Sequence, residues 1–171
     1  MTTLHLMVGL PGSGKTTTAR RLEAEHSALR LTVDEWHIRL FGSDVDDDSD
    51  HAAWLLHDQR HAAVEALLQE TATRVLALGV DVILDFGFWA RSERDELRAL
   101  AQDLGVGFQI HYSGASDELM LSRIRARNAH SPAGAFPVPE AKLKEWTGQF
   151  EPPSADELLT ENPCATHKEG N

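Results

Sequence analysis

Short apolar runs alternate along the chain with longer segments in which apolar residues recur every three or four positions. A short run bounded by polar residues or glycine is typical of a buried strand, and the longer spacing is typical of a helix packed on one face. Gly79 is expected to end the third helix and Ser92 to cap the fourth. The pattern predicts strands at residues 4–8, 29–33, 80–84 and 108–112, and helices at 17–26, 35–41, 51–78, 91–104, 116–128 and 139–148.

Strands that alternate with helices predict an α/β fold, a three-layer sandwich in which helices flank a parallel sheet. In such sheets the ligand lies at the carboxyl ends of the strands. The segments that follow the expected strands should therefore line the site. These segments are residues 9–16, Asp34, residues 85–89 and the stretch after Tyr112.

Residues 9–16 fit the phosphate-binding P-loop, in which two glycines separated by four residues are followed by Lys-Thr. The glycines let the backbone point its N–H groups at phosphate oxygens, and the start of the next helix attracts the same negative charge. Lys15 is expected to reach the β- and γ-phosphates, and the Thr16 hydroxyl to ligate Mg²⁺. We therefore expect a P-loop NTPase that binds ATP or GTP through Gly9, Pro11, Gly12, Ser13, Gly14, Lys15, Thr16 and Thr17.

Two aspartates at strand ends favour transfer of a phosphoryl group to a hydroxyl. Asp34 is positioned to accept the proton of an attacking hydroxyl, although an aspartate in front of a helix also commonly caps it. Asp85 follows a hydrophobic run, which is the form of the acidic motif that holds Mg²⁺ through water. Because aspartate is frequent at strand ends, the sequence leaves open whether Asp85 serves the metal or the acceptor.

Arg123 and Arg127 lie four residues apart and should share one face of the helix at 116–128. A lid rich in proline, glycine and alanine is expected to follow them, at about residues 128–139. Arginines at the mouth of a lid can close over ATP and stabilise charge on the transferring phosphoryl group. The alternative is a solvated basic helix end that pairs with Glu118 and the helix dipole.

The 171 residues suffice for one domain, expected at residues 1–150, before a tail at 151–171 that we expect to be partly disordered. A lone cysteine, Cys164, and the lack of a signal peptide or a membrane-spanning run favour the cytoplasm. The formal net charge is −11, with 16 lysines and arginines against 27 aspartates and glutamates. This balance disfavours nucleic acid and suits a neutral or cationic small molecule. The sequence indicates no oligomeric state.

With these residues in place, the chain from Leu4 to about Phe150 resembles the small P-loop kinases typified by the kinase domain of phage polynucleotide kinase. Zeta-toxin-like and chloramphenicol-phosphotransferase-like enzymes belong to the same group of small AAA-type kinases. The resemblance implies a nucleoside-kinase-like fold with a helical lid, ATP bound by residues 9–16, and Asp34 as the general base. The family's aspartate at the end of the third strand is matched by Asp85, and the R-x-x-R motif in the helix that follows is matched by residues 91–94. The family's pair of arginines at the entry to the lid is matched by Arg123 and Arg127.

The sequence departs from the polynucleotide kinases on the acceptor side. His37 stands where those enzymes carry an arginine that binds the acceptor's phosphate, and an acidic loop at residues 44–50 lies near the acceptor's entrance. His57 and His61 share a helix face but lack an evident third zinc ligand, so we favour packing or pocket lining for them. The acceptor is expected to contact Asp34, His37, Phe88, Trp89 and Arg94, with one aromatic ring covering it.

We predict an enzyme, an ATP- and Mg²⁺-dependent kinase that phosphorylates a hydroxyl of a small molecule, with a cationic, antibiotic-like compound as one candidate acceptor. Two alternatives stay open. One is the same chemistry on a polynucleotide 5′-hydroxyl, and the other is a non-catalytic nucleotide-binding switch. A switch needs no base for an acceptor, so its activity would survive the substitution Asp34→Ala.

Overall fold

The computed structural model describes residues 1–46, 48–130 and 136–159. Four parallel strands form its sheet in the order β2-β3-β1-β4. The strands are β1 (Thr3–Val8), β2 (Leu29–Thr32), β3 (Val82–Gly87) and β4 (Gly107–Tyr112). The helices are α1 (Lys15–His26), α2 (Val33–Phe41), α3 (His51–Ala77), α4 (Arg91–Leu104), α5 (Asp117–His130) and α6 (Glu140–Gln149).

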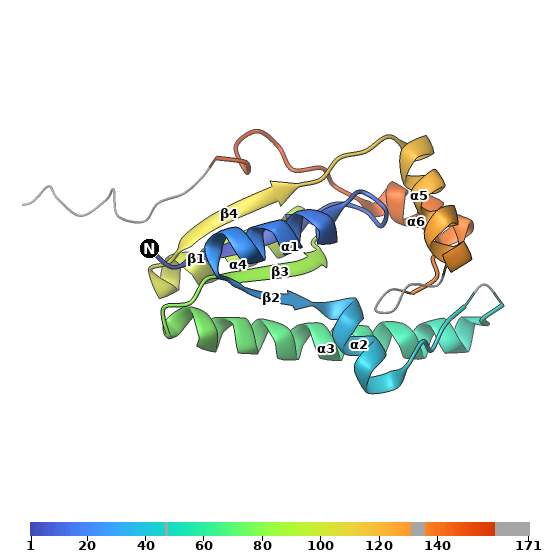
Figure 1. Ribbon diagram of the computed structural model, residues 1–171, viewed down its shortest axis with the longest axis horizontal. Helices are drawn as coiled ribbons and strands as arrows, with labels where there is room; N and C mark the ends of the chain where they lie inside the picture. Colours follow the sequence, from blue (N-terminus) through green and yellow to red (C-terminus); the bar gives the residue numbers. More distant parts are fainter. Residues whose placement is uncertain (47, 131–135, 160–171) are drawn as a thin grey trace, which may run out of the picture.

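Alternation along β1 explains why helices cover both faces of the sheet. Successive side chains of a strand point to opposite faces. Leu4 and Leu6 are fully buried among residues of α3 and α4, whereas Met7 packs with Ala19 and Leu22 of α1. Figure 1 shows α1 in front of the sheet and α4 behind it. The predicted three-layer α/β sandwich is confirmed.

The carboxyl ends of all four strands meet at one edge, where the remaining elements gather. α2 begins directly after β2, and α5 and α6 lie beyond the arrowheads of the strands (Figure 1). A small buried cluster forms there from Ile124 of α5, Leu143 of α6 and Val138, which precedes α6. This separate hydrophobic cluster packs α5 against α6, and both helices line the pocket at the carboxyl ends of the strands.

Several element boundaries differ from the prediction for local reasons. β3 starts at Val82 and continues to Gly87, because pairing with β1 extends as far as Val8 opposite Gly87. α2 starts at Val33, which puts Asp34 in the first turn of a helix and not at a strand end. α4 is capped at Ala90, whose N–H donates to the Glu93 carboxylate at 2.9 Å, so Ser92 is not the cap.

Two predicted features lie partly outside the described residues: the lid at 128–139, and the tail with Cys164. At the lid's described margins, Asn128 exchanges side-chain hydrogen bonds with the backbone of Val138 at 2.9 and 3.1 Å. In the tail, Glu157 is 2% exposed and pairs with Arg94 of α4, so we count residues 151–159 with the domain. Among the described helices, none is long and apolar enough to cross a membrane.

Candidate active site

The P-loop turns tightly between β1 and α1, and two of its glycines are required by close approach. Gly9 has φ +146°, and a Cβ there would lie 2.6 Å from the carbonyl oxygen of Ser113. Gly12 has φ +79°, and its Cβ would lie 2.9 Å from the carbonyl oxygen of Met120. A side chain at Gly9 would push the loop away from the segment between β4 and α5, and one at Gly12 would push it away from α5 itself. The loop is thereby held at the start of α1, where anions bind favourably.

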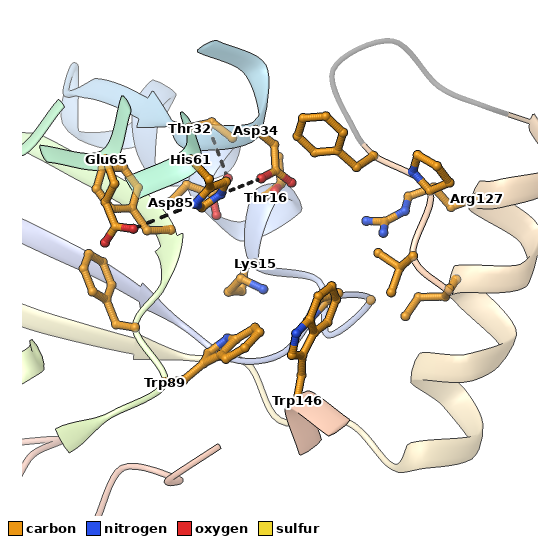
Figure 2. A pocket seen from close by; sticks show the side chains of 18 of the residues that line it. Lys15, Thr16, Thr32, Asp34, His61, Glu65, Asp85, Trp89, Arg127 and Trp146 are labelled. Carbon is orange, nitrogen blue, oxygen red and sulfur yellow. Dashed lines mark hydrogen bonds and ion pairs between the residues drawn. The ribbon is translucent and has the colours of Figure 1, made fainter. Parts of the chain in front are cut away.

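Lys15 lies between the two sides of the pocket in Figure 2. Its Nζ donates to the carbonyl oxygen of Leu10 at 2.9 Å, so the side chain bends back over its own loop. Burial lowers the pKa of the ammonium to about 8, although Asp85 and Asp34 act in the opposite direction. The group is therefore largely protonated at neutral pH, and a triphosphate would stabilise that charge further.

Asp85 and Thr16 provide the oxygen ligands expected of a magnesium site. The Asp85 carboxylate is 4% exposed and accepts a hydrogen bond from the Thr32 hydroxyl at 3.3 Å. Thr16 also hydrogen-bonds to it, while Oδ1 has no partner among the described residues. Burial raises the pKa of Asp85 above its ordinary value. A buried carboxylate oxygen without a partner, beside a hydroxyl, fits a hard divalent cation such as Mg²⁺.

Asp34 faces the pocket with His61 as its partner. The Asp34 side chain is 42% exposed, and its Oδ1 lies 3.4 Å from Nε2 of His61. Burial raises the pKa of Asp34, but the bond to His61 and the charges of Lys15 and Arg127 outweigh it, so the pKa falls below its ordinary value. Burial lowers the pKa of His61, and Asp34 and Glu65 reverse this and raise it. Asp34 is thus an ionised carboxylate held in place by a histidine.

The two arginines of α5 do different things. Arg123 donates to the carbonyl oxygens of Gly12 and Ser13 at 3.1 and 3.3 Å, so it lines the pocket and supports the P-loop backbone. Arg127 points into the pocket in Figure 2, and its Nε has no partner among the described residues. Burial lowers the pKa of Arg127 while Asp34 raises it. Arg127 therefore lines the pocket with a donor that no described residue engages.

The pocket has a volume of about 490 Å³ and joins the P-loop to an aromatic and acidic chamber. Trp89 and Trp146 form one wall, with ring centroids 5.5 Å apart (Figure 2). Phe88 also lines the pocket but is 4% exposed and belongs to the core. Of the two aromatic residues expected to contact the acceptor, Trp89 is therefore the more accessible from the pocket. The chamber's other aromatic and acidic side chains are Trp54, Asp58, Glu65, Phe86, Glu93 and Phe136.

Some of these residues carry little signal in the sequence. Glu65 lies one helical turn after His61 and shares its face, so the spacing of α3 could have indicated it. Thr32 precedes Asp34 by two residues, and its part in the site is visible only in the fold, where its hydroxyl donates to Asp85. Trp146 belongs to α6, and nothing in its local pattern indicates that α6 folds over the P-loop.

His37 does not line the pocket, contrary to prediction. It is fully buried, and its Nε2 lies 3.0 Å from Asp44 Oδ2. Asp44 also contacts Nδ1 of His57 at 2.8 Å and accepts from Arg60 at 3.0 Å. These partners hold the pKa of Asp44 well below its usual range despite its partial burial. The first carboxylate of the acidic loop is thus neutralised within the protein and unavailable to attract a ligand.

Arg94 also lies outside the pocket lining and serves a structural purpose. It is fully buried and binds both oxygens of Glu157, at 2.7 and 3.2 Å. Its Nη1 donates to the carbonyl oxygens of Phe88 and Trp89 at 3.1 and 3.2 Å. The helical phase of α4 turns Arg94 inward, so it holds the Trp89 segment in position and does not touch an acceptor.

The buried pair makes a stability prediction. Glu157→Gln should destabilise the fold by about 3–5 kcal/mol, because it leaves the Arg94 charge buried without an anion. The melting temperature should fall by roughly 6–20 °C in a thermal scan. Asp156→Asn is the matched control: its partner Arg91 is exposed, so the change should leave the melting temperature close to that of the parent. Equal shifts in both variants would contradict the assignment.

The same pair predicts an acid limb of stability. Burial alone would raise the pKa of Glu157, but the bonds from Arg94 lower it to about 2 from its ordinary value of 4.5. A depressed native pKa stabilises the fold fully above pH 4.5, and this contribution is lost as the pH falls towards 2. The free energy of unfolding, measured by denaturant titration at several pH values in this range, should fall more steeply with decreasing pH for the parent chain than for Glu157→Gln.

The family to which this chain belongs follows from a sequence comparison. A family model described as an AAA domain matches residues 4–153, which covers the P-loop, both aspartates and the arginines of α5. The protein belongs to this AAA domain family. The match confirms the resemblance to the small P-loop kinases, because it spans almost the whole described domain. No curated protein matches this chain.

Solved structures show the same fold. Kti12 of Chaetomium thermophilum, in complex with ADP-AlF3, is 21% identical with a TM-score of 0.65, covering 88% of this chain and 81% of that one. A sugar kinase of Janibacter sp. is 19% identical with a TM-score of 0.60, covering 91% and 82%. A chain of the Pnkp1/Rnl/Hen1 RNA repair complex is 21% identical with a TM-score of 0.62, covering 86% and 43%. The AAA domain described above thus has a P-loop kinase-like fold.

Proposed function

We propose that this protein is a kinase that transfers the γ-phosphoryl group of ATP to a hydroxyl of a small molecule. One observation carries the proposal: an ionised carboxylate, Asp34, faces the P-loop lysine and Arg127 across a single pocket. An ionised carboxylate at that place can take the proton that an acceptor hydroxyl loses, which supports transfer to an acceptor. A pure nucleotide switch would not need it.

The mechanism follows from these positions. The acceptor hydroxyl oxygen bonds to the γ-phosphorus, the bond from that phosphorus to the β–γ bridging oxygen breaks, and ADP leaves. Asp34 takes the hydroxyl proton, and Lys15 and Arg127 offset negative charge on the transferring group. Mg²⁺, held by Thr16 and Asp85, would neutralise charge on the phosphates. Catalysis is mainly positioning, as phosphoryl transfer requires little covalent work from the protein.

The chamber favours an acceptor that combines a flat apolar surface with positive charge. Trp54, Trp89 and Trp146 line the pocket, and tryptophan is the best aromatic partner of a cation, as the Lys142 ammonium 5.3 Å from the centre of the Trp54 ring illustrates. Asp58 and Glu65 add negative charge to the same pocket. This charge comes from α3 and not from the acidic loop, whose Asp44 is already paired. A negatively charged polynucleotide end suits such a lining poorly.

The test is a product assay with the purified full chain, ATP and Mg²⁺. The acceptors are matched pairs of hydroxylated molecules, each with and without an amine, together with a 5′-hydroxyl oligonucleotide. We expect one phosphate added to an aminated acceptor, detected by mass spectrometry and lost in Lys15→Met. Phosphorylation of the oligonucleotide would establish the polynucleotide reaction instead. ATP binding without turnover on any acceptor would favour the switch.

His61 makes a separate prediction on pH dependence. Its hydrogen bond and charge keep the pKa of Asp34 low, so His61→Gln should let that pKa rise. Because the base must be ionised, the acid limb of kcat/KM should move to higher pH, with a smaller change on the alkaline side. His51→Gln, at the exposed start of α3, is the control and should leave the profile unchanged. An unmoved acid limb in His61→Gln would remove His61 from this role.

A further inference from the structure

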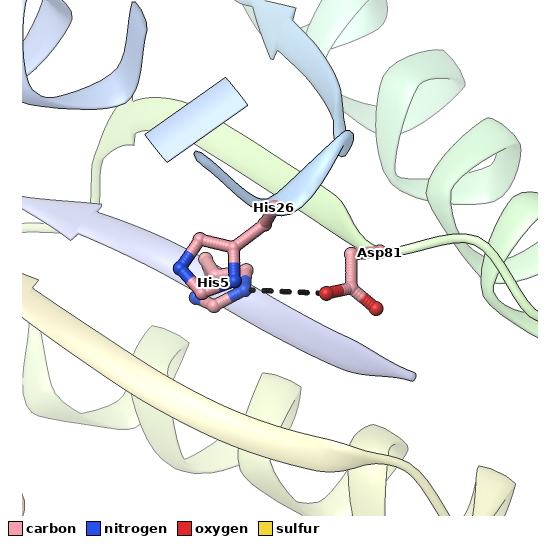
Figure 3. A group of neighbouring side chains, drawn as sticks. All are labelled: His5, His26 and Asp81. Atoms are coloured by element: carbon pink, nitrogen blue, oxygen red, sulfur yellow. Dashed lines mark ion pairs between the residues drawn. The ribbon is translucent and has the colours of Figure 1, made fainter. Parts of the chain in front are cut away.

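A second group of metal-ligating side chains lies at the opposite edge of the sheet from the P-loop. His5 belongs to β1, His26 is the last residue of α1, and Asp81 directly precedes β3 (Figure 3). One nitrogen or oxygen of each lies within 4.8 Å of the other two. The three residues come from separate elements, so the juxtaposition is a product of the fold.

His5 carries the most telling atom of this group. The residue is 1% exposed, and its Nδ1 lies 3.0 Å from Nε2 of His111 in β4. Its Nε2 has no hydrogen-bond partner among the described residues. Asp81 Oδ2 lies 3.9 Å from this nitrogen, which is too far for a hydrogen bond. A buried nitrogen left without a partner, and aimed at a carboxylate, calls for a bound group between them.

Asp81 and His26 complete the set. The N–H of Thr3 donates to Asp81 Oδ1 at 2.9 Å, which fixes the carboxylate and leaves Oδ2 towards His5. The His26 ring lies with its centroid 5.0 Å from that of His5 and is exposed to solvent.

We propose that His5, His26 and Asp81 bind one Zn²⁺ ion, with water as the fourth ligand. Two imidazoles and a carboxylate are a ligand set that zinc accepts, and nitrogen ligands exclude Mg²⁺ and Ca²⁺ as good alternatives. Zinc–ligand bonds of roughly 2.0–2.1 Å in a tetrahedron put ligand atoms about 3.4 Å apart. The separation of 3.9 Å between His5 and Asp81 needs to shorten only slightly.

His111 supports the site from behind. When Nδ1–H of His5 donates to His111, the lone pair of His5 Nε2 is free for the metal, which is the usual arrangement of a metal-ligating histidine. The ion would tie the starts of β1 and β3 to the end of α1. Since α1 begins at Lys15, the site braces the helix behind the P-loop without contacting the nucleotide pocket.

In a second triad, His37, Asp44 and His57, one potential ligand atom of each residue also lies within 4.8 Å of the others. The surroundings of this triad disfavour a cation. Asp44 already contacts both histidines and accepts a hydrogen bond from Arg60 at 3.0 Å. A positively charged guanidinium on the same carboxylate opposes a metal ion there. Of the two triads among the described residues, we therefore assign the metal to the one at His5, where a buried ring nitrogen lacks a hydrogen-bond partner.

Titration of the full chain, freed of any histidine tag, with Zn²⁺ in a calorimeter tests the proposal. We expect one ion per chain, with affinity falling tenfold or more in His26→Ala and in Asp81→Asn. His26 is exposed, and asparagine keeps the acceptor for the Thr3 N–H, so both variants should fold. His51→Ala removes an exposed histidine elsewhere and should bind as the parent does.

Thermal scans and Co²⁺ provide readouts independent of kinase activity. At a Zn²⁺ concentration one hundred times its dissociation constant, the melting temperature should rise by about 5–10 °C in the parent and in His51→Ala. Co²⁺ should give the visible absorption of a tetrahedral site in the same two proteins. Zinc binding that is unchanged in His26→Ala, or absent from the parent, would overturn the proposal.

Discussion

Asp34→Asn should lower kcat about 10²–10⁴-fold with any acceptor that the protein phosphorylates, while ATP binding changes little. Asparagine keeps the size of the side chain and can still bond to His61, but it cannot take the proton from the acceptor hydroxyl. The ionised state of Asp34, maintained by His61, Lys15 and Arg127, is what the substitution removes. Steady-state kinetics with a nucleotide-binding titration separates the two effects.

Glu35→Gln provides the matched control for this experiment. Glu35 follows Asp34 in the first turn of α2, but its carboxylate pairs with Arg30 and Arg20 and does not line the pocket. Its loss should leave kcat near the parent value. Full turnover in Asp34→Asn would refute the base assignment, and loss in both variants would indicate damage to α2.

Arg127→Ala should lower kcat about 10³–10⁵-fold, the range over which an arginine stabilises phosphoryl transfer. Arg127 is half-buried, its guanidinium points into the pocket, and its buried Nε has no partner among the described residues. Such a group is free to bond to the transferring phosphoryl group, where charge changes most between ground state and transition state. The effect should therefore fall on kcat more than on KM for ATP.

The neighbouring arginines of α5 separate this role from a general loss of positive charge. Arg125→Ala removes an exposed guanidinium that pairs with Glu140 and should leave turnover unchanged. Arg123→Ala should mainly raise KM for ATP, because Arg123 binds the carbonyl oxygens of Gly12 and Ser13 in the P-loop. If Arg127→Ala behaved like Arg125→Ala, the bound nucleotide would be stabilised by other groups.

Much of the fold and half of the site could be read from local pattern. The four strands, their alternation with helices and the P-loop each depend on residues close together in the chain, where periodicity and spacing carry the information. The placement of Asp34 and Asp85 at one edge follows from the geometry of parallel sheets, and Thr32 links that edge through its bond to Asp85. The roles of these residues stay predictions.

What the tertiary structure alone decided concerns side chains whose partners are distant in sequence. Arg94 turns inward because Glu157, beyond the expected end of the domain, supplies a buried counter-charge. His37 is bound to Asp44 and so leaves the acceptor side to Trp89 and Trp146. Hydrophobic spacing specifies which face of an element is buried. A buried charged group is stable only with a partner, and that partner can come from any element that the fold places beside it. That choice is made between elements, and no local pattern contains it.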